Sequence, residues 1–234
     1  MVAGQHYRLK QLVQPLFLEG YNRGMETVKS LAEGKVILHN VSWTTYELLL
    51  SEHLDSSAPR FTYDRGELEI ISPSPEHEKL NRRIAQLIIT FTEEMNIEAE
   101  DLGSTTFRRE DLERGFEPDS CFYIENKGRI RGKGRIDLTV DPPPDLVIEI
   151  DITSPSLDKV PIYARMKVPE VWRFDGQRLA ILALEGTVYV ESAQSTVLPP
   201  LTGATLSDFI GKSKSMKRTA WLRTVREWAR EQTG

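Results

Sequence analysis

The stretch DLVIEIDIT, residues 145–153, alternates apolar and polar side chains with a period of two, as a half-buried β-strand does. Its leucine and isoleucines fall on one face, and Glu149 and Asp151 fall on the other. Two like charges about 6.6 Å apart along a strand repel each other. We therefore expect a cation to offset this repulsion, and a divalent cation such as Mg²⁺, which takes oxygen ligands, is the economical candidate.

A second predicted strand supplies another carboxylate. In GFEPDSCFYI, residues 115–124, Asp119 follows Pro118 and shares a strand face with Cys121 and Tyr123. Mg²⁺ is commonly held by one or two carboxylates together with substrate phosphate. Two neighbouring strands that each bring one acid to the same point are therefore enough to define a candidate site.

The segments before these strands predict further elements of an α/β fold. A short helix begins after Ser42, and RFTYD and ELEIIS then predict two strands joined at Arg65 and Gly66. A long helix follows Ser74, which suits the N-cap, with Pro75 in the first helical position and apolar residues at helical spacing.

The remaining chain alternates predicted strands with short helices. Residues 98–109 and 115–124 predict one strand each, and residues 127–135 predict a loop. A short helix with Pro161 near its start follows, and EVWRFDG, RLAILAL and TVYVES predict three more strands before a helix near residues 206–210. The fold class is therefore α/β (α+β), with a mixed central β-sheet flanked by helices.

We predict three parts in the chain. A lead-in without clear periodicity covers residues 1–41, one domain covers residues 42–211, and a C-terminal segment covers residues 212–234. The last part holds an amphipathic helix over residues 217–232, whose tryptophans we expect to pack on the domain or on a second subunit.

Composition excludes several classes of protein. Of 234 residues, 39% are hydrophobic and 28% are charged, which is typical of a folded chain and not of a disordered one. The single cysteine, Cys121, excludes an intramolecular disulfide and a cysteine-rich zinc site, so we predict a reducing, cytoplasmic location. No segment resembles a signal peptide or a membrane span. The net charge of −5 argues against binding nucleic acid by bulk charge.

Several short motifs occur in an order that resembles a known family. They are ISPSPEH (71–77) before the long helix, EPD (117–119), PDLVIE (144–149), TSPS (153–156), Lys159 four residues before Tyr163, and VPEVW (168–172) followed by FD (174–175). This order resembles the PD-(D/E)XK nuclease superfamily, and over residues 42–175 it is more closely similar to the bacterial family of Uma-type restriction endonucleases.

The resemblance implies a restriction-endonuclease-like core with a metal site. Asp119 and Glu149 would be ligands of Mg²⁺ or Mn²⁺, and a lysine would orient water and stabilise developing charge. The superfamily has this lysine two residues after the acid, where this chain has Asp151. The closer family offers a lysine from the following helix, here Lys159, with Lys167 as the competing choice. Asp151 would then add a ligand and favour a second metal, or signal lost activity.

The sequence allows two interpretations each for His77 and for the basic run KGRIRGKGR, residues 127–135. His77 falls on the apolar side of its helix, which is typical of a buried structural histidine, while the resemblance places it at the helix end facing the metal centre. The basic run would clamp phosphates if its loop emerges at the end of the sheet that bears the site, or would be a solvated loop tip otherwise. Its cations are Lys127, Arg129, Arg131, Lys133 and Arg135.

The resemblance implies a divalent-metal-dependent endonuclease that hydrolyses phosphodiester bonds of nucleic acid, DNA in the first instance, and acts as a homodimer. One alternative keeps the fold but loses catalysis, leaving a nucleic-acid-binding or regulatory module. Another alternative uses the paired carboxylates as acid and base, as glycosidases do.

Overall fold

The computed structural model describes residues 34–53, 58–152 and 157–232. The chain separates into two units, residues 1–31 and 32–234, and all of the described residues belong to the second unit. Most of the expected lead-in, up to residue 33, lies outside the described residues, as does the TSPS motif at 153–156. The last seven or so residues of the expected lead-in include a strand that the sequence analysis did not predict, Gly34–Leu38.

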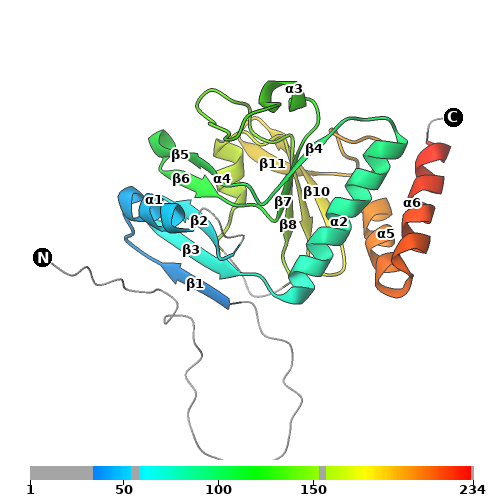
Figure 1. The fold of residues 1–234 in the computed structure, drawn as a ribbon, viewed down its shortest axis with the longest axis horizontal. Coiled ribbons are helices and arrows are strands. Elements are labelled where there is room, and N and C mark those ends of the chain that lie inside the picture. The colour runs from blue at the N-terminus through cyan, green and yellow to red at the C-terminus, as the bar shows by residue number, and fades with distance from the viewer. Residues whose placement is uncertain (1–33, 54–57, 153–156, 233–234) are drawn as a thin grey trace, which may run out of the picture. The chain divides into compact units, whose positions relative to one another are not determined.

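The described chain contains both helices and strands, with several runs of successive strands (Figure 1). In order they are β1 (Gly34–Leu38), α1 (Trp43–Glu52), β2 (Arg60–Asp64), β3 (Glu67–Ser72), α2 (Pro75–Glu94), β4 (Glu100–Gly103), β5 (Phe107–Arg109), β6 (Arg114–Phe116), β7 (Ser120–Tyr123), α3 (Lys127–Ile130), β8 (Leu146–Ile150), α4 (Val160–Arg165), β9 (Glu170–Phe174), β10 (Leu179–Glu185), β11 (Val188–Ser192), α5 (Gly203–Ser215) and α6 (Arg218–Glu231).

These strands form two sheets. A five-stranded sheet has the order β1-β3-β2-β6-β5, and a six-stranded sheet has the order β11-β10-β9-β8-β7-β4. In the six-stranded sheet β8 and β9 run parallel while β7 and β8 run antiparallel, so this sheet is mixed. The predicted α/β class with a mixed sheet flanked by helices is confirmed, and the five-stranded sheet is an addition to it.

The second sheet arises because two segments predicted as single strands are each divided. The segment 98–109 gives β4 in one sheet and β5 in the other, and the segment 115–124 gives part of β6 and β7 in the same way. Gly103, with φ of +55°, adopts a left-handed conformation where the first segment breaks. Pro118, which has no backbone N–H for a ladder, lies where the second one breaks. The prediction of two uninterrupted strands was wrong.

The predicted ends of the helices and the hairpin are confirmed. Ser42 and Ser74 cap α1 and α2 through their side-chain oxygens, and Pro75 opens α2. The turn between β2 and β3 holds Arg65 at φ of +47° and Gly66 at +96°, as a tight hairpin requires. The predicted basic loop begins with the short helix α3, and the helix expected near 206–210 is longer, since Thr202 caps it at Gly203.

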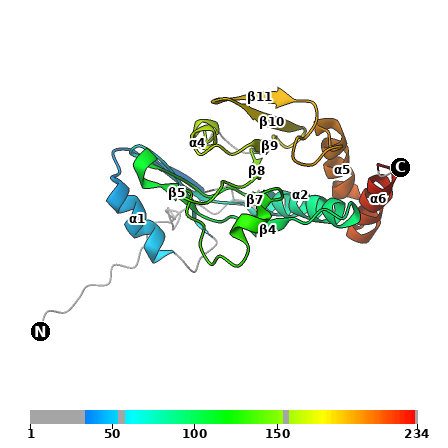
Figure 2. The same cartoon turned by 90° about the horizontal axis from the view of Figure 1, so that it is seen from above.

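Apolar clusters cover both faces of the six-stranded sheet. On one face α2, α5 and α6 pack together over the sheet, and Figure 2 shows these three helices side by side. Trp221 of α6 is buried there. On the other face Ile162 of α4 and Met166, which follows this helix, pack in one cluster with Val147 of β8 and Val171 of β9. In the described part of the chain, no helix combines the length and the apolar character needed to cross a membrane.

Candidate active site

The antiparallel pairing of β7 and β8 brings the first two candidate residues to one end of the sheet. Ser120 lies opposite Ile148, so Asp119, which directly precedes β7, lies beside the end of β8 that carries Glu149. The backbone N–H of Ile150 donates to Oδ2 of Asp119 at 2.7 Å. Both carboxylates are buried, with exposed fractions of 3% and 6%.

Asp119 is held by donors from two other elements. Nε2 of His77, in the first turn of α2, lies 2.7 Å from its Oδ1, and the guanidinium of Arg60 on β2 pairs with the same oxygen. Nδ2 of Asn81 donates to the backbone oxygen of Asp119 at 2.8 Å. Burial alone would raise the pKa of Asp119, but the hydrogen bond from His77 and the charges of Lys159 and Arg60 outweigh it and lower that pKa. Asp119 is therefore ionised.

Glu149 has a different environment. Nζ of Lys159 donates to its Oε2 at 2.8 Å, and the hydroxyl of Tyr163 donates to its Oε1. Burial raises the pKa of Glu149 to about 7, since the opposing charge of Lys159 is partly cancelled by the negative charge of Asp119. Two carboxylates that influence each other in this way share one buried environment, and its excess negative charge keeps one of them close to protonation at neutral pH.

Lys159 is the common cation of this environment. It directly precedes α4, whose Pro161 lies within the first turn, and 11% of its side chain is exposed. Burial alone would lower the pKa of Lys159, but the charges of Glu149, Asp119 and Glu69 raise it above its ordinary value. The ammonium is therefore charged, and it compensates several carboxylates at once.

The sequence analysis did not identify several polar residues around this lysine. Glu69 of β3 is fully buried, and its Oε2 accepts the backbone N–H of Leu157 at 2.8 Å. Glu117 is half-buried and accepts hydrogen bonds from Thr106 and from the N–H of Phe61, and burial raises its pKa. The other missed residues are Arg60 and Tyr163. We call Glu69, Asp119, Glu149 and Lys159 the acidic cluster.

The only feature of the local sequence that could have indicated a site role for Glu69 and Arg60 was their position in strands that alternate polar and apolar residues. Both are charged residues in a half-apolar hairpin, and a charge at a buried strand position needs a partner. Register places them on one face, because Arg60 lies opposite Ile71 and Thr62 lies opposite Glu69. Their partners Asp119 and Leu157 lie 59 and 88 positions away in sequence, so no spacing within the hairpin reveals them.

The donor set suits a hard divalent cation. The acidic cluster contributes three carboxylates and one ammonium, and Arg60 with the half-buried Glu117 adds one charge of each sign. The excess of negative charge matches a doubly charged ion, and Asp119 and Glu149 offer oxygen ligands. Within residues 34–53, 58–152 and 157–232, no three acidic, histidine or cysteine side chains are gathered closely enough to form a ready metal cage. A cation held here would keep several waters, as Mg²⁺ usually does.

Comparison with known families assigns the chain to one of them. The model of the family described as "Uma2: Putative restriction endonuclease" matches residues 43–211, which is more than half of the chain. The chain belongs to this family. No protein of curated function matches it. A crystal structure described as a putative nuclease belonging to DUF820, from Anabaena variabilis ATCC 29413, is 16% identical, with a TM-score of 0.46 over 73% of this chain and 99% of that chain.

The Uma2 match includes every residue of the acidic cluster, and Asp151 has an ion-pair partner outside that cluster. Oδ2 of Asp151 lies 2.7 Å from Nη2 of Arg173 on β9, and 31% of its side chain is exposed. Its backbone N–H continues the pairing of β8 with β9 by donating to the oxygen of Phe174 at 2.8 Å. The repulsion between Glu149 and Asp151 is thus offset by Lys159 on one and by Arg173 on the other.

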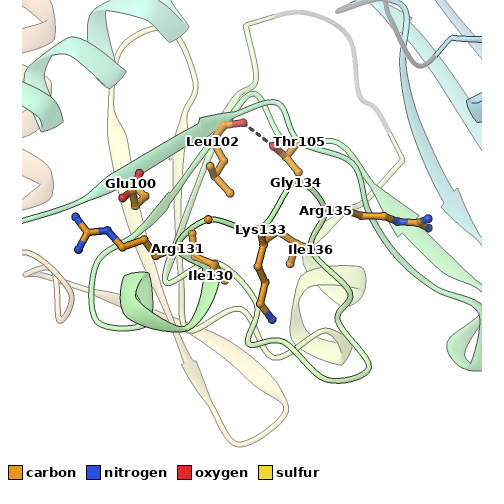
Figure 3. Close-up of a pocket in the computed structure, with 10 residues that line it drawn as sticks. Glu100, Leu102, Thr105, Ile130, Arg131, Lys133, Gly134, Arg135 and Ile136 are labelled. Carbon is orange, nitrogen blue, oxygen red and sulfur yellow. Dashed lines mark hydrogen bonds between the residues drawn. The ribbon is translucent and has the colours of Figure 1, made fainter.

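The basic run of this Uma2 protein begins at the opposite end of β7 from Asp119, since α3 follows the end of that strand. Arg131 and Arg135 are exposed, and Lys133 pairs with Asp141. The run lines a pocket of about 200 Å³ together with Glu100 of β4 (Figure 3). Figure 3 shows the side chains of Arg131, Lys133 and Arg135 pointing in three different directions.

Proposed function

We propose that this protein is a divalent-metal-dependent endonuclease that hydrolyses phosphodiester bonds of nucleic acid, with DNA as the first substrate to test. The observation that carries the proposal is the burial of Asp119 and Glu149 around one lysine at the end of β7 and β8. Membership of the Uma2 family supports it. Buried carboxylates with shifted pKa values in one cluster are a frequent mark of a catalytic site.

Each residue of the site has a distinct proposed role. Asp119 and Glu149 would hold Mg²⁺ or Mn²⁺, which when bound supplies a Lewis acid for the phosphate and an activated water. Asp119 is already oriented for this role by His77, Arg60 and the N–H of Ile150. Lys159 would stabilise the negative charge that develops on the phosphate, because its ammonium donates to Glu149 and interacts electrostatically with Asp119.

The proposal assigns His77 a positioning role. Only 4% of the His77 side chain is exposed, and its ring contacts Asp119. His77 is therefore both buried and close to the proposed metal ligand. This arrangement combines the two interpretations that the sequence left open. Asp151 has no assigned ligand role here, because its carboxylate pairs with Arg173 and is partly exposed.

A cleavage assay tests the proposal. Purified protein is incubated with supercoiled plasmid, single-stranded DNA and branched DNA, with Mg²⁺ or Mn²⁺ and with a chelator. We expect metal-dependent cutting that Glu149→Ala abolishes and that Asp151→Asn, which changes an acid two residues away, retains. Cutting that survives in Glu149→Ala would point to a contaminating nuclease, and cutting that survives the chelator would favour acid–base chemistry by carboxylates alone.

One observation favours the runner-up, an inactive module that binds nucleic acid. Both side-chain oxygens of Asp119 and both of Glu149 accept hydrogen bonds from protein groups. A site that had lost its metal would be stabilised in this self-paired form. Retention of DNA in a mobility-shift assay, without cutting under any metal condition and without an effect of Glu149→Ala, would support this second function.

A further inference from the structure

One carboxylate oxygen near the proposed metal ligands remains to be explained. Glu69 is fully buried, and its Oε1 has no hydrogen-bond partner among the residues that the structure describes. A buried charged oxygen without a donor is costly, and such an atom usually marks a water, an ion or a group that arrives in another state of the protein. Its other oxygen, Oε2, accepts the N–H of Leu157 at 2.8 Å.

The fold directs Glu69 toward the site. It shares a face of the five-stranded sheet with Arg60, whose guanidinium pairs with Asp119. Residues in this diagonal relation across antiparallel strands lie about 7 to 8 Å apart. The hydrogen bond to Leu157 also attaches Glu69 to the segment that carries Lys159, two residues further along. Glu69 therefore lies on the face of its sheet that is directed toward Asp119, and it contacts the backbone two residues before Lys159.

Binding of a metal would favour movement of the Lys159 ammonium away from Glu149, and Glu69 offers an alternative acceptor. The Lys159 ammonium donates to Oε2 of Glu149, and the hydroxyl of Tyr163 donates to Oε1, so a divalent cation on Glu149 would compete with these donors for the carboxylate oxygens. The positively charged ammonium and the metal cation repel each other, whereas the neutral hydroxyl of Tyr163 does not repel the metal cation. The ammonium is therefore the donor that we expect to leave. Lysine carries its charge on a flexible four-carbon stem, and the negative charge of Glu69 already acts on Lys159.

We propose that Glu69 is a positioning residue for Lys159, and that its free Oε1 accepts the ammonium when a divalent cation takes the place of that ammonium on Glu149. This inference rests on the proposed function, because it concerns the same metal ligands. Glu69 holds Lys159 beside the site in the metal-bound state, where the lysine can still act on the substrate phosphate.

A double-mutant cycle on Mn²⁺ affinity tests the inference. The four proteins are wild type, Glu69→Gln, Lys159→Met and the double variant, and Glu67→Gln, an exposed acid on the same strand, is the control. In Glu69→Gln the ammonium has no alternative acceptor and stays on Glu149, so Mn²⁺ affinity should fall about tenfold, as expected for residues coupled in one network. With Lys159→Met present, Glu69→Gln should change the affinity by less than about twofold, because the coupling is removed.

The outcomes separate the two proposals. An equal loss of affinity from Glu69→Gln in both backgrounds would mean that Glu69 acts by its charge or as a direct ligand, and would overturn the positioning role. A wild-type protein that does not bind Mn²⁺ would overturn the proposed function, and this inference with it. Circular dichroism melting of every variant checks that each is folded.

A second measurement does not depend on the folding of Glu69→Gln. The ¹⁵N signal of the Lys159 ammonium in wild-type protein, assigned by its absence from Lys159→Met, is followed while Mg²⁺ is added. We expect the signal to shift with the metal as the ammonium changes its acceptor. A signal that does not move while Mg²⁺ binds would contradict the exchange.

Discussion

Glu149 combines deep burial with two donors, Lys159 just before α4 and Tyr163 within it. Its pKa of about 7 lies well above the ordinary value of 4.5, because burial outweighs the attraction of Lys159 and the charge of Asp119 adds to the effect. The folded protein therefore retains a proton on Glu149 that the unfolded chain releases. The stability linked to this proton is fully present below about pH 4.5 and is lost as the pH rises through about 7.

Replacement of Glu149 by Gln should remove this pH dependence. Between pH 5 and pH 8 the wild type should lose up to about 3 kcal/mol of unfolding free energy relative to Glu149→Gln, since one pKa unit corresponds to about 1.4 kcal/mol. Urea denaturation at both pH values measures it, and Glu227→Gln, on the exposed face of α6, should follow the wild type. A gap between wild type and Glu149→Gln that is constant with pH would mean that the carboxylate is not protonated in the folded protein.

Arg60 should be important for stability as well as for the orientation of Asp119. Its guanidinium is buried between Asp119 and Glu78, so Arg60→Gln leaves a buried carboxylate without its cation. We expect a loss of about 3 kcal/mol in unfolding free energy, in the range found when one partner of a buried pair is removed. The control is Arg82→Gln, since Arg82 lies 4.0 Å from the same Glu78 but is 70% exposed, and it should cost less than about 1 kcal/mol.

The proximity of three candidate residues could be predicted from the sequence, while their roles as metal ligands and as catalytic lysine stay predictions. Asp119 directly precedes β7, Glu149 lies near the end of β8 and Lys159 directly precedes α4, and the structure brings the three together. Asp151 has the same local pattern as Glu149, but Arg173 of the neighbouring strand pairs with it. The strand pairing that supplies this partner is not visible in the sequence around Asp151.

At the scale of elements, the strongest predictions were those with local causes. The caps at Ser42 and Ser74 and the turn at Arg65–Gly66 need only residues within a few positions, and all of them are confirmed. The division of strands between two sheets depends on which pairings between strands distant in sequence are the more stable. A glycine or a proline inside a predicted strand was the available sign of that division, at Gly103 and Pro118.

The C-terminal helix should contribute strongly to stability. Trp221 of α6 is 1% exposed, and its Nε1 donates to the backbone oxygen of Phe209 in α5 at 2.8 Å. Trp221→Ala should cost about 3 to 5 kcal/mol, as large-to-small changes of buried aromatic residues do. Arg223→Ala on the exposed face of the same helix should stay within about 0.5 kcal/mol of the wild type. A small effect of Trp221→Ala on the thermal or urea midpoint would mean that α6 is only loosely packed.

The basic run lies at the opposite end of β7 from Asp119, so it does not meet the condition for clamping phosphates at the site, and we predict that it contacts the DNA backbone elsewhere, in proportion to its unpaired positive charge. Arg131 and Arg135 are exposed, whereas Asp141 already pairs with Lys133. We expect Arg131→Gln and Arg135→Gln each to weaken DNA binding equally across sequences and to reduce the slope of log affinity against log salt by about 1, while Lys133→Gln has a smaller effect. Fluorescence anisotropy over a salt series measures this. Unchanged slopes in both arginine variants would remove the run from the binding surface.

For the whole molecule, a net charge of −5 means that a DNA substrate would have to be attracted by a local surface. Cleavage of both strands also requires two centres or two binding events, and we predict a homodimer on that ground. Sedimentation at micromolar concentration should give twice the mass of one chain, and addition of duplex DNA should retain that stoichiometry. A monomer in both conditions would restrict the protein to nicking or to single-stranded and branched substrates.

The central claim is that Asp119 and Glu149 share one divalent cation, and a crystal soaked in Mn²⁺ tests it most directly. Anomalous scattering locates manganese without any assumption about activity. The account predicts a peak within coordination distance of both carboxylates, with the ammonium of Lys159 turned away from Glu149. Anomalous density beside Asp151, or a well-occupied soak with no peak between Asp119 and Glu149, would contradict it.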